Sequence, residues 1–182
     1  TMDNLLEYSG ANALFPPLDT WETSFNKGKG RSYGLETDFG WRSEKLTLTA
    51  YYTLSWSQRK FDGIWPEWYS HRYDNRHKIT LIGGWKLSRT VELYASWNYH
   101  SGNRMTVATH IYNPGEVFDR IYTQPNNVVL PDYHRLDLGA NFRKISKKGL
   151  EHVWNISVYN VYNRKNVVFV SVSERDDKSL YG

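Results

Sequence analysis

The chain has 182 residues, a net charge of +4 and no cysteine, and 16% of its residues are aromatic. The absence of cysteine excludes a disulfide framework and thiolate metal sites. The charge is modest and forms no Lys/Arg stripe along one face, which argues against nucleic-acid binding. The chain also lacks a run of about twenty apolar residues, so the sequence predicts no transmembrane helix.

Apolar and polar residues alternate along most of the chain, which is typical of β-strands with two different faces. A partial first strand is predicted at Met2–Tyr8. Seven further strands are predicted at Ser32–Trp41, Leu46–Ser57, His77–Lys86, Val91–His100, Arg135–Arg143, Trp154–Tyr159 and Val167–Ser173.

The connections between these strands alternate in length. Short turns are predicted at Arg42–Lys45 and Leu87–Thr90, a turn of medium length at Lys144–Glu151, and a short link at Asn163–Asn166. Long loops are predicted at Ser9–Gly30, Gln58–Arg76 and Ser101–Pro131, the last with strand extensions at Thr106–Tyr112 and Val117–Thr123. An antiparallel meander places every second connection at the same end. Short turns at one end and long loops at the other are typical of outer-membrane β-barrels.

The two faces of the predicted strands differ in charge. On the apolar face, about two dozen positions from Tyr33 to Phe142 carry no formal charge. A Lys or Arg that faces lipid at mid-membrane costs about 2–4 kcal/mol, so a lipid-facing surface should exclude charge. The other face holds the charged residues Glu36, Asp38, Lys78, Lys86, Glu92, Arg135, Asp137 and Arg143. We expect Arg135 with Asp137, and Glu36 with Asp38, to belong to salt-bridge ladders across strands in a barrel lumen.

Aromatic residues of the apolar face cluster at the strand ends. Trp41, Trp85, Phe142 and Trp154 lie beside short turns, and Tyr33, Trp56 and Tyr99 lie at the long-loop ends. Two aromatic levels around an apolar band are typical of a membrane barrel. The sequence therefore favours an all-β fold, an antiparallel transmembrane β-barrel. A soluble β-sandwich is the alternative, because it also has one apolar and one polar face.

Several segments resemble the C-terminal part of a TonB-dependent outer-membrane receptor of the Bacteroidetes type. The resemblance rests on Gly30–Glu36 (G-x-x-x-G-x-E), Leu46–Ser55, Tyr73–Lys78 (with D-x-R-H), Pro131–Gly139 (P-x-Y-x-R-L-D-L) and Val158–Asn163 (N-x-x-N). These segments span most of the chain in the order that the family has.

The resemblance implies that residues 1–182 form about seven to eight strands of a 22-strand barrel, and that the plug domain and the closing strand are absent from this sequence. It implies a transporter in the bacterial outer membrane that imports a scarce or bulky nutrient, such as a siderophore, a glycan fragment or a peptide. The implied partners are outer-membrane lipid, the TonB–ExbB–ExbD complex acting through the plug, and a surface lipoprotein. Two alternative functions are a small outer-membrane barrel enzyme, such as a protease or a lipase, and a soluble β-sandwich binding module.

The candidate ligand-binding residues lie in the predicted loops and at the outer mouth. Aromatic rings stack on sugars or cyclic ligands, and arginine side chains bind carboxylates. The candidates are Trp65, Trp68, Tyr69, His71, Arg72 and Tyr73 in a loop, and Tyr94, Asn98, His100 and Arg104 toward the lumen. Packing between loops is the alternative role for the first group, and a hydrogen-bonded lumen wall is the alternative for the second.

No residues form a convincing catalytic constellation. The carboxylates of Glu36 and Asp38 have only Thr and Ser as predicted cross-strand partners, and no serine lies in a nucleophile elbow. His71 and His77 with Asp74 fit no strong metal-ligand motif. We therefore expect neither an enzyme, nor a metal site, nor a cofactor.

Overall fold

The computed structural model describes residues 1–8, 25–107, 110–112, 119–121 and 123–170. Within these ranges the regular elements are β-strands: β1 (Met2–Tyr8), β2 (Phe25–Arg42), β3 (Leu46–Phe61), β4 (Trp65–Ser70), β5 (His77–Lys86), β6 (Val91–His100), β7 (Arg104–Met105), β8 (His110–Tyr112), β9 (Asp119–Ile121), β10 (Val128–Val129), β11 (Tyr133–Ile145) and β12 (Glu151–Val158). The described residues include no helix that is long and apolar enough to cross a membrane.

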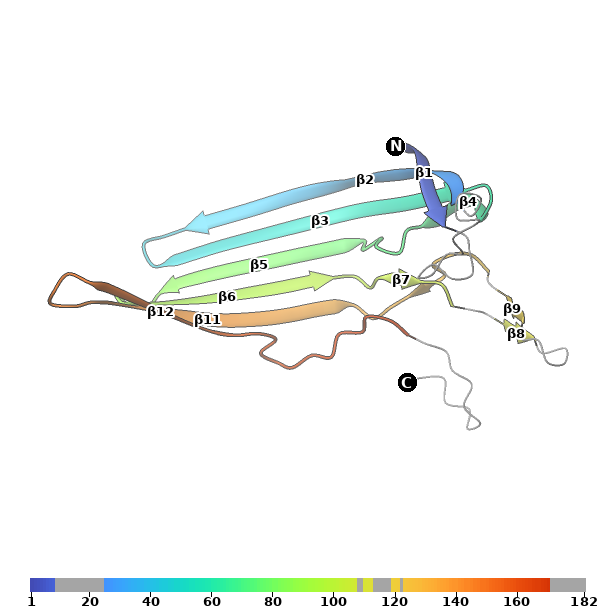
Figure 1. The fold of residues 1–182 in the computed structure, drawn as a ribbon. Coiled ribbons are helices and arrows are strands. Elements are labelled where there is room, and N and C mark those ends of the chain that lie inside the picture. The colour runs from blue at the N-terminus through green and yellow to red at the C-terminus, as the bar shows by residue number, and fades with distance from the viewer. Residues whose placement is uncertain (9–24, 108–109, 113–118, 122, 171–182) are drawn as a thin grey trace.

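Eight of the strands form one antiparallel sheet (Figure 1). Seven are hydrogen-bonded side by side in the order β1-β2-β3-β5-β6-β11-β12, and β4 pairs with the end of β3. The turns 43–45, 87–90 and 146–150 lie at one end of the sheet, the short-turn end. The segments with β4, β7 and β10 lie at the opposite end, the loop end. The all-β antiparallel prediction is confirmed.

Three strands, β1, β5 and β6, have the bounds that the sequence predicts. Both β2 and β3 continue past the predicted bounds at the loop end, because Phe25–Gly30 pairs with β1 and Gly28–Arg31 pairs with Gln58–Phe61. The sequence placed Gly28 in a loop. A Cβ atom at Gly28 would clash with the ring of the fully buried Phe61, so the glycine serves close packing within the strand.

The predicted long loops contain short strands. Strand β4 lies within the predicted loop Gln58–Arg76, which the sequence left without strand structure. Within Ser101–Pro131, β7 pairs with β10, and β8 pairs with β9. The predicted extensions Thr106–Tyr112 and Val117–Thr123 are shorter than expected where they are described. Residues 9–24, 108–109, 113–118 and 122 lie outside the described residues.

The predicted strand Val167–Ser173 is wrong over residues 167–170, and its remainder lies outside the described residues. The chain leaves the sheet after β12 at Asn160, whose φ is +53°. Beyond this point the side chain of Asn166 takes the place of a strand partner. Its amide nitrogen donates to the His134 carbonyl at 3.1 Å, and its oxygen accepts the His134 N–H at 3.2 Å. The Asn166 side chain therefore makes the hydrogen bonds that a neighbouring strand would otherwise make with the backbone of β11 at His134.

The strand register places the predicted apolar residues on one face of the sheet. One row across five strands contains Phe39, Ala50, Leu81, Trp97 and Leu136. Because side chains alternate between faces, every second residue along each strand shares this face. The row includes Phe39, whose surface is 62% exposed, so the apolar face is uncovered in this structure.

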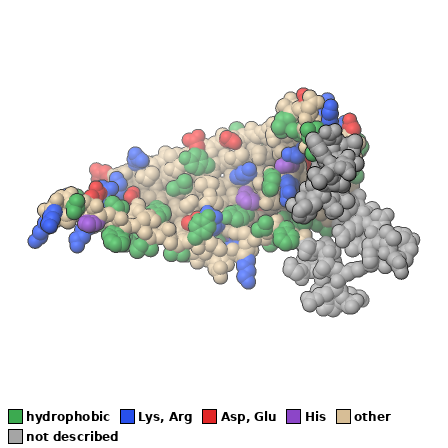
Figure 2. All heavy atoms as spheres, viewed as in Figure 1, with side chains coloured by type: hydrophobic (Ala, Val, Ile, Leu, Met, Phe, Trp, Pro, Cys, Tyr) green, Lys and Arg blue, Asp and Glu red, His purple; other side chains and the backbone are tan. Residues whose placement is uncertain are grey.

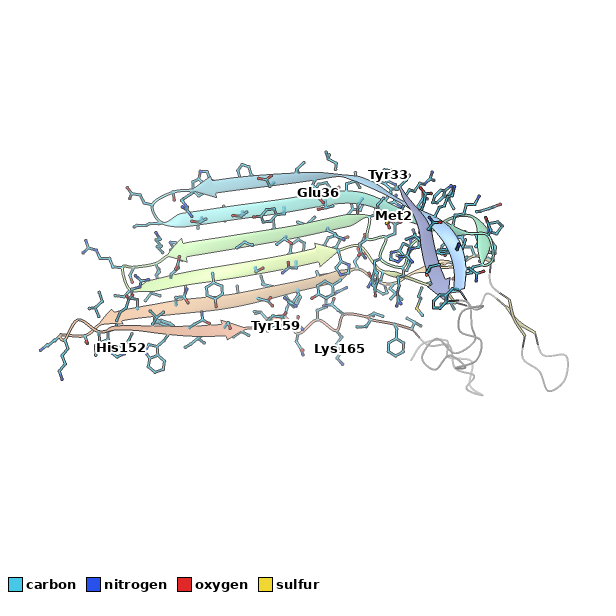
Figure 3. The ribbon with its side chains drawn as sticks, turned by 45° about the horizontal axis from the view of Figure 1, so that its top comes forward. Met2, Tyr33, Glu36, His152, Tyr159 and Lys165 are labelled. Atoms are coloured by element: carbon cyan, nitrogen blue, oxygen red, sulfur yellow. The ribbon has the colours of Figure 1, made fainter. Side chains whose placement is uncertain are left out.

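The sheet is a single layer (Figure 3). Among the described residues the buried hydrophobic side chains are Phe61, Tyr69 and Leu130, far fewer than the core of a two-sheet sandwich contains. Figure 2 shows hydrophobic side chains along the surface of the sheet and Lys or Arg side chains at the tip of the β11–β12 hairpin. The described residues do not form a β-sandwich.

Hydrogen bonds and ion pairs connect the polar face. Arg135 bonds Asp137 at 2.9 Å, so this ion pair runs along one strand and not across strands as predicted. Asn98 accepts a bond from Thr80 across the sheet at 3.2 Å. The exposed Glu36 and Asp38 have no ion-pair partner among the described residues, which contradicts the expected ladder at that position.

Candidate ligand-binding pocket

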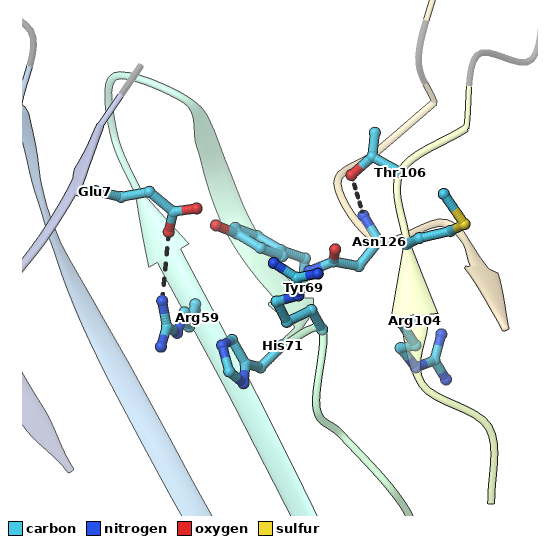
Figure 4. Close-up of a pocket in the computed structure, with 9 residues that line it drawn as sticks. Glu7, Arg59, Tyr69, His71, Arg104, Thr106 and Asn126 are labelled. Atoms are coloured by element: carbon cyan, nitrogen blue, oxygen red, sulfur yellow. Dashed lines mark hydrogen bonds and ion pairs between the residues drawn. The ribbon is translucent and has the colours of Figure 1, made fainter. Parts of the chain in front are cut away.

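A pocket of about 290 Å³ lies at the loop end, where five segments of the chain meet (Figure 4). The segments are β1, the end of β3, the stretch from β4 to residue 72, the stretch from β7 to residue 106, and the turn before β10. The residues that line the pocket are Glu7, Arg59, Tyr69, His71, Arg72, Arg104, Met105, Thr106 and Asn126.

Asp74 connects segments next to the pocket, although it does not line the pocket itself. Its side chain is fully buried, and one carboxylate oxygen accepts the N–H of Ser57 at 2.7 Å. The other oxygen lies 3.1 Å from Arg76 and 3.9 Å from Arg104. A buried carboxylate requires such partners, because an unpaired charge away from water is costly. Asp74 therefore joins β3, through Ser57, to β7, through Arg104.

Asn126 attaches the turn before β10 to the pocket. Its backbone has a φ of +56°, a conformation that asparagine adopts more readily than most residues. Its N–H donates to the Thr106 hydroxyl at 2.9 Å, and its side-chain amide donates to the Ser70 carbonyl at 2.8 Å. The first bond connects residues 20 positions apart in the sequence and the second connects residues 56 positions apart, so together they keep the pocket wall in place.

The charge of the pocket is predominantly positive. Arg59, Arg72 and Arg104 line it, whereas Glu7 is its only carboxylate among the described residues. The closest Arg59–Glu7 distance is 3.5 Å, long for a charge-assisted hydrogen bond, which usually measures about 2.7–2.9 Å. Arg72 is exposed and has no ion-pair partner among the described residues. Its guanidinium lies 5.1 Å from the ring centre of Tyr73.

Burial and the arginines shift two titrating groups of the pocket. Burial, together with the negative charge of Glu7, raises the pKa of Tyr69 to about 12 despite the opposing effect of Arg59. The pKa of His71 is lowered to about 4, mainly by burial and in addition by the positive charges of Arg59 and Arg72. At neutral pH both side chains are therefore uncharged and can form hydrogen bonds.

The pKa of His71 predicts a loss of stability in mild acid. The unfolded chain takes up a proton at this histidine near pH 6.5, and the folded chain only near pH 4. The folded state should therefore lose stability as the pH falls from about 6.5 to about 4. Because the side chain is partly exposed, we expect a loss of about 1 kcal/mol.

A His71→Gln variant cannot titrate at this position, so it provides the control. As the pH is lowered from 7.5 to 4.5, the unfolding midpoint of the wild type should decrease relative to that of the variant. Parallel pH curves for the two proteins would show that His71 does not titrate as described.

Four of the ten predicted site residues meet in the pocket, namely Tyr69, His71, Arg72 and Arg104. Other members of the predicted loop group lie elsewhere. Trp68 stacks under the Arg31 guanidinium at 4.4 Å. Tyr73 is 55% exposed beside the pocket, with its ring edge-on to His71. Trp65 pairs with Phe61 where β3 meets β4.

The remaining predicted residues belong to the wall of the polar face. Tyr94 lies across Gly139, where an added Cβ would meet the tyrosine ring, and its hydroxyl accepts a bond from Asn155. Asn98 bonds Thr80, as described above. His100 stacks on Tyr133 with parallel rings 4.7 Å apart. In this structure these three residues have wall contacts, and the pocket does not include them.

Five pocket residues were absent from the predicted set: Glu7, Arg59, Met105, Thr106 and Asn126. Arg59 had a sequence signal, because it flanks the aromatic loop. Glu7 reaches the pocket only through the pairing of β1 with β2, and no local pattern marks such a contact. Among the described residues, no group of three or more His, Cys, Asp or Glu side chains could hold a metal ion.

Comparisons of the chain with protein-family models, with curated proteins and with solved structures find no match.

Proposed function

We propose that this chain forms part of the wall and external loops of an outer-membrane β-barrel, in a receptor that imports a scarce or bulky nutrient with energy from TonB. The single observation that carries this proposal is the uncovered apolar face of a one-layer antiparallel sheet. Soluble monomers rarely expose apolar patches larger than a few hundred Å². A lipid bilayer would remove such a face from water along its whole length.

The spacing of the aromatic residues supports a membrane-spanning sheet. Tyr33 and Trp56 stack with ring centres 5.4 Å apart, and Trp41 follows Tyr33 by eight residues on the same strand. On β11, Phe142 follows His134 by the same interval. Eight residues span about 27 Å of strand. At a tilt of about 40° this corresponds to a height of about 20 Å, close to the apolar band of about 25 Å in such barrels.

The two edges of the sheet support the proposal that it is part of a larger barrel. Strand β1 covers only the part of β2 up to Gly30, so β2 has no outer neighbour from Arg31 to Arg42 among the described residues. On the outer side of β12, too, the described part of the chain supplies no neighbouring strand. Lipid cannot satisfy open backbone groups, so strands in a membrane must continue into a closed barrel. The remaining strands of a 22-strand barrel, which the sequence resemblance implies, would complete the pairing.

The orientation of the sheet follows from the same proposal. The short-turn end faces the periplasm and the loop end faces outward, as in outer-membrane barrels generally. The pocket at the loop end is then accessible from outside the cell. Ligand entry there, with TonB–ExbB–ExbD acting through a plug domain and a surface lipoprotein assisting, fits the family that the sequence resembles.

Cell fractionation tests the membrane assignment. The protein should be found in the outer-membrane fraction, resist a sodium carbonate wash, and require detergent for extraction. Uptake of its nutrient should stop when TonB is deleted. Extraction in soluble form without detergent would overturn the barrel assignment, and TonB-independent uptake would overturn the energy coupling.

A further inference from the structure

The pocket and the ion pairs beside it hold an excess of positive charge. Arg59, Arg72 and Arg104 line the pocket, and Arg76 contacts Asp74, the carboxylate that also lies 3.9 Å from Arg104. The two carboxylates of the region, Glu7 and Asp74, neutralise half of this charge. About two positive charges therefore remain without a counter-charge among the described residues of the region.

We propose that this pocket binds a small oxyanion with two negative charges, either a dicarboxylate or a phosphate ester. Guanidinium groups present planar pairs of N–H donors that match carboxylate and phosphate oxygens. The biological role of this ligand, as the imported nutrient or a group on it, rests on the proposed receptor function. The binding chemistry rests on the pocket alone.

Two of the arginines are available to a ligand. The exposed guanidinium of Arg72 has no carboxylate partner among the described residues. Arg59 contacts Glu7 at 3.5 Å with both side chains partly exposed, 31% and 39%. A weak ion pair of this kind contributes little and can exchange for a ligand oxyanion. Arg104 is held at the pocket wall, because its N–H donates to the Arg72 carbonyl at 2.8 Å.

The uncharged polar groups suit an oxyanion that also carries hydroxyl or ester oxygens. Tyr69 and His71 are neutral at pH 7 for the reasons given above, so neither adds a charge that would alter the balance. The pocket also contains the Thr106 hydroxyl and the amide of Asn126. A volume of about 290 Å³ accommodates a small molecule, or one charged group of a larger ligand, but not a folded partner.

Calorimetry with matched probes tests the proposal on the detergent-purified protein. Succinate and inorganic phosphate are the dianionic probes, and succinamide is the neutral control with nearly the same shape as succinate. We expect at least one dianion to bind and succinamide to show no binding. Which dianion binds more tightly distinguishes the dicarboxylate from the phosphate assignment. Equal binding of succinamide and succinate, or no binding of either dianion, would overturn the proposal.

Arg72→Gln locates the binding to the pocket. The variant should weaken dianion binding at least tenfold, because it removes the arginine that has no carboxylate partner. Arg42→Gln removes the same charge at the short-turn end, outside the pocket, and should change the affinity by less than twofold. Equal losses in both variants would show that the net charge of the protein, and not this pocket, attracts the anion. If Arg72→Gln does not assemble, Arg72→Lys keeps the charge without the planar donor pair and should bind several-fold more weakly than wild type.

The binding and membrane experiments fail independently. A chain that inserts into the outer membrane but binds no dianion overturns the ligand assignment and leaves the barrel proposal intact. A chain that is soluble without detergent but binds succinate or phosphate through Arg72 overturns the receptor function and leaves the pocket chemistry intact.

Discussion

Replacement of Ala50 by arginine should prevent stable assembly in the outer membrane, whereas replacement of the adjacent Thr49 by arginine should be tolerated. Ala50 lies in the middle of the apolar face, between Phe39 and Leu81 on the neighbouring strands. If this face contacts lipid, an arginine there costs about 2–4 kcal/mol. That loss is a large fraction of the stability of a typical protein domain.

Thr49 provides a matched control, because it precedes Ala50 in β3 and its side chain therefore points to the opposite face of the sheet. Its cross-strand neighbours are Gly40 and Ile82, and the space beside Gly40 is open. An arginine at Thr49 can therefore extend over the polar face into water.

Quantitative immunoblotting of outer-membrane fractions, with heat-modifiable migration on gels as the folding readout, compares the two variants. We expect folded Ala50→Arg at less than a tenth of the wild-type level, and Thr49→Arg near that level. Equal amounts of the two folded variants would contradict the assignment of the apolar face to lipid.

The alternation of side chains explains why the sheet could be predicted from the sequence. A period of two over ten residues has few competing interpretations, and an error of one residue would move charges such as Glu92 onto the apolar face. The structure places β5 and β6 at the predicted bounds and in the register that keeps apolar residues together. Local patterns therefore determined the central strands and their faces.

The prediction failed where tertiary contacts outweigh local patterns. Gly28 is a loop signal in the sequence, but the Phe61 ring over its backbone makes it part of β2. The apolar run after Asn166 suggests a strand, but that side chain has already paired with the backbone of β11. The pocket is harder still to predict, because Glu7 and Asn126 reach it from segments far apart in the chain.

A second large effect is expected at Asp74, whose carboxylate is fully buried and lies 3.9 Å from the pocket residue Arg104. An Asp74→Asn substitution keeps an oxygen that can accept the Ser57 N–H, but it removes the negative charge beside Arg76 and Arg104. Loss of one partner from a buried ion pair commonly costs about 3–5 kcal/mol. The two arginines keep 34% and 25% of their side-chain surface exposed, so water compensates in part and we expect about 2 kcal/mol.

The matched control for Asp74→Asn is Glu36→Gln, which also neutralises one carboxylate but at an exposed position without an ion pair among the described residues. Such surface substitutions usually change stability by less than about 0.5 kcal/mol. Thermal unfolding of both purified variants in the same detergent should therefore show a clear drop in the midpoint for Asp74→Asn alone. If the two midpoints fall together, the stability of the loop end does not depend on the ion pairs of Asp74. The stability of the loop end would then depend on other contacts, such as the hydrogen bonds of Asn126 to Thr106 and Ser70 and those of Asn127 to Val107.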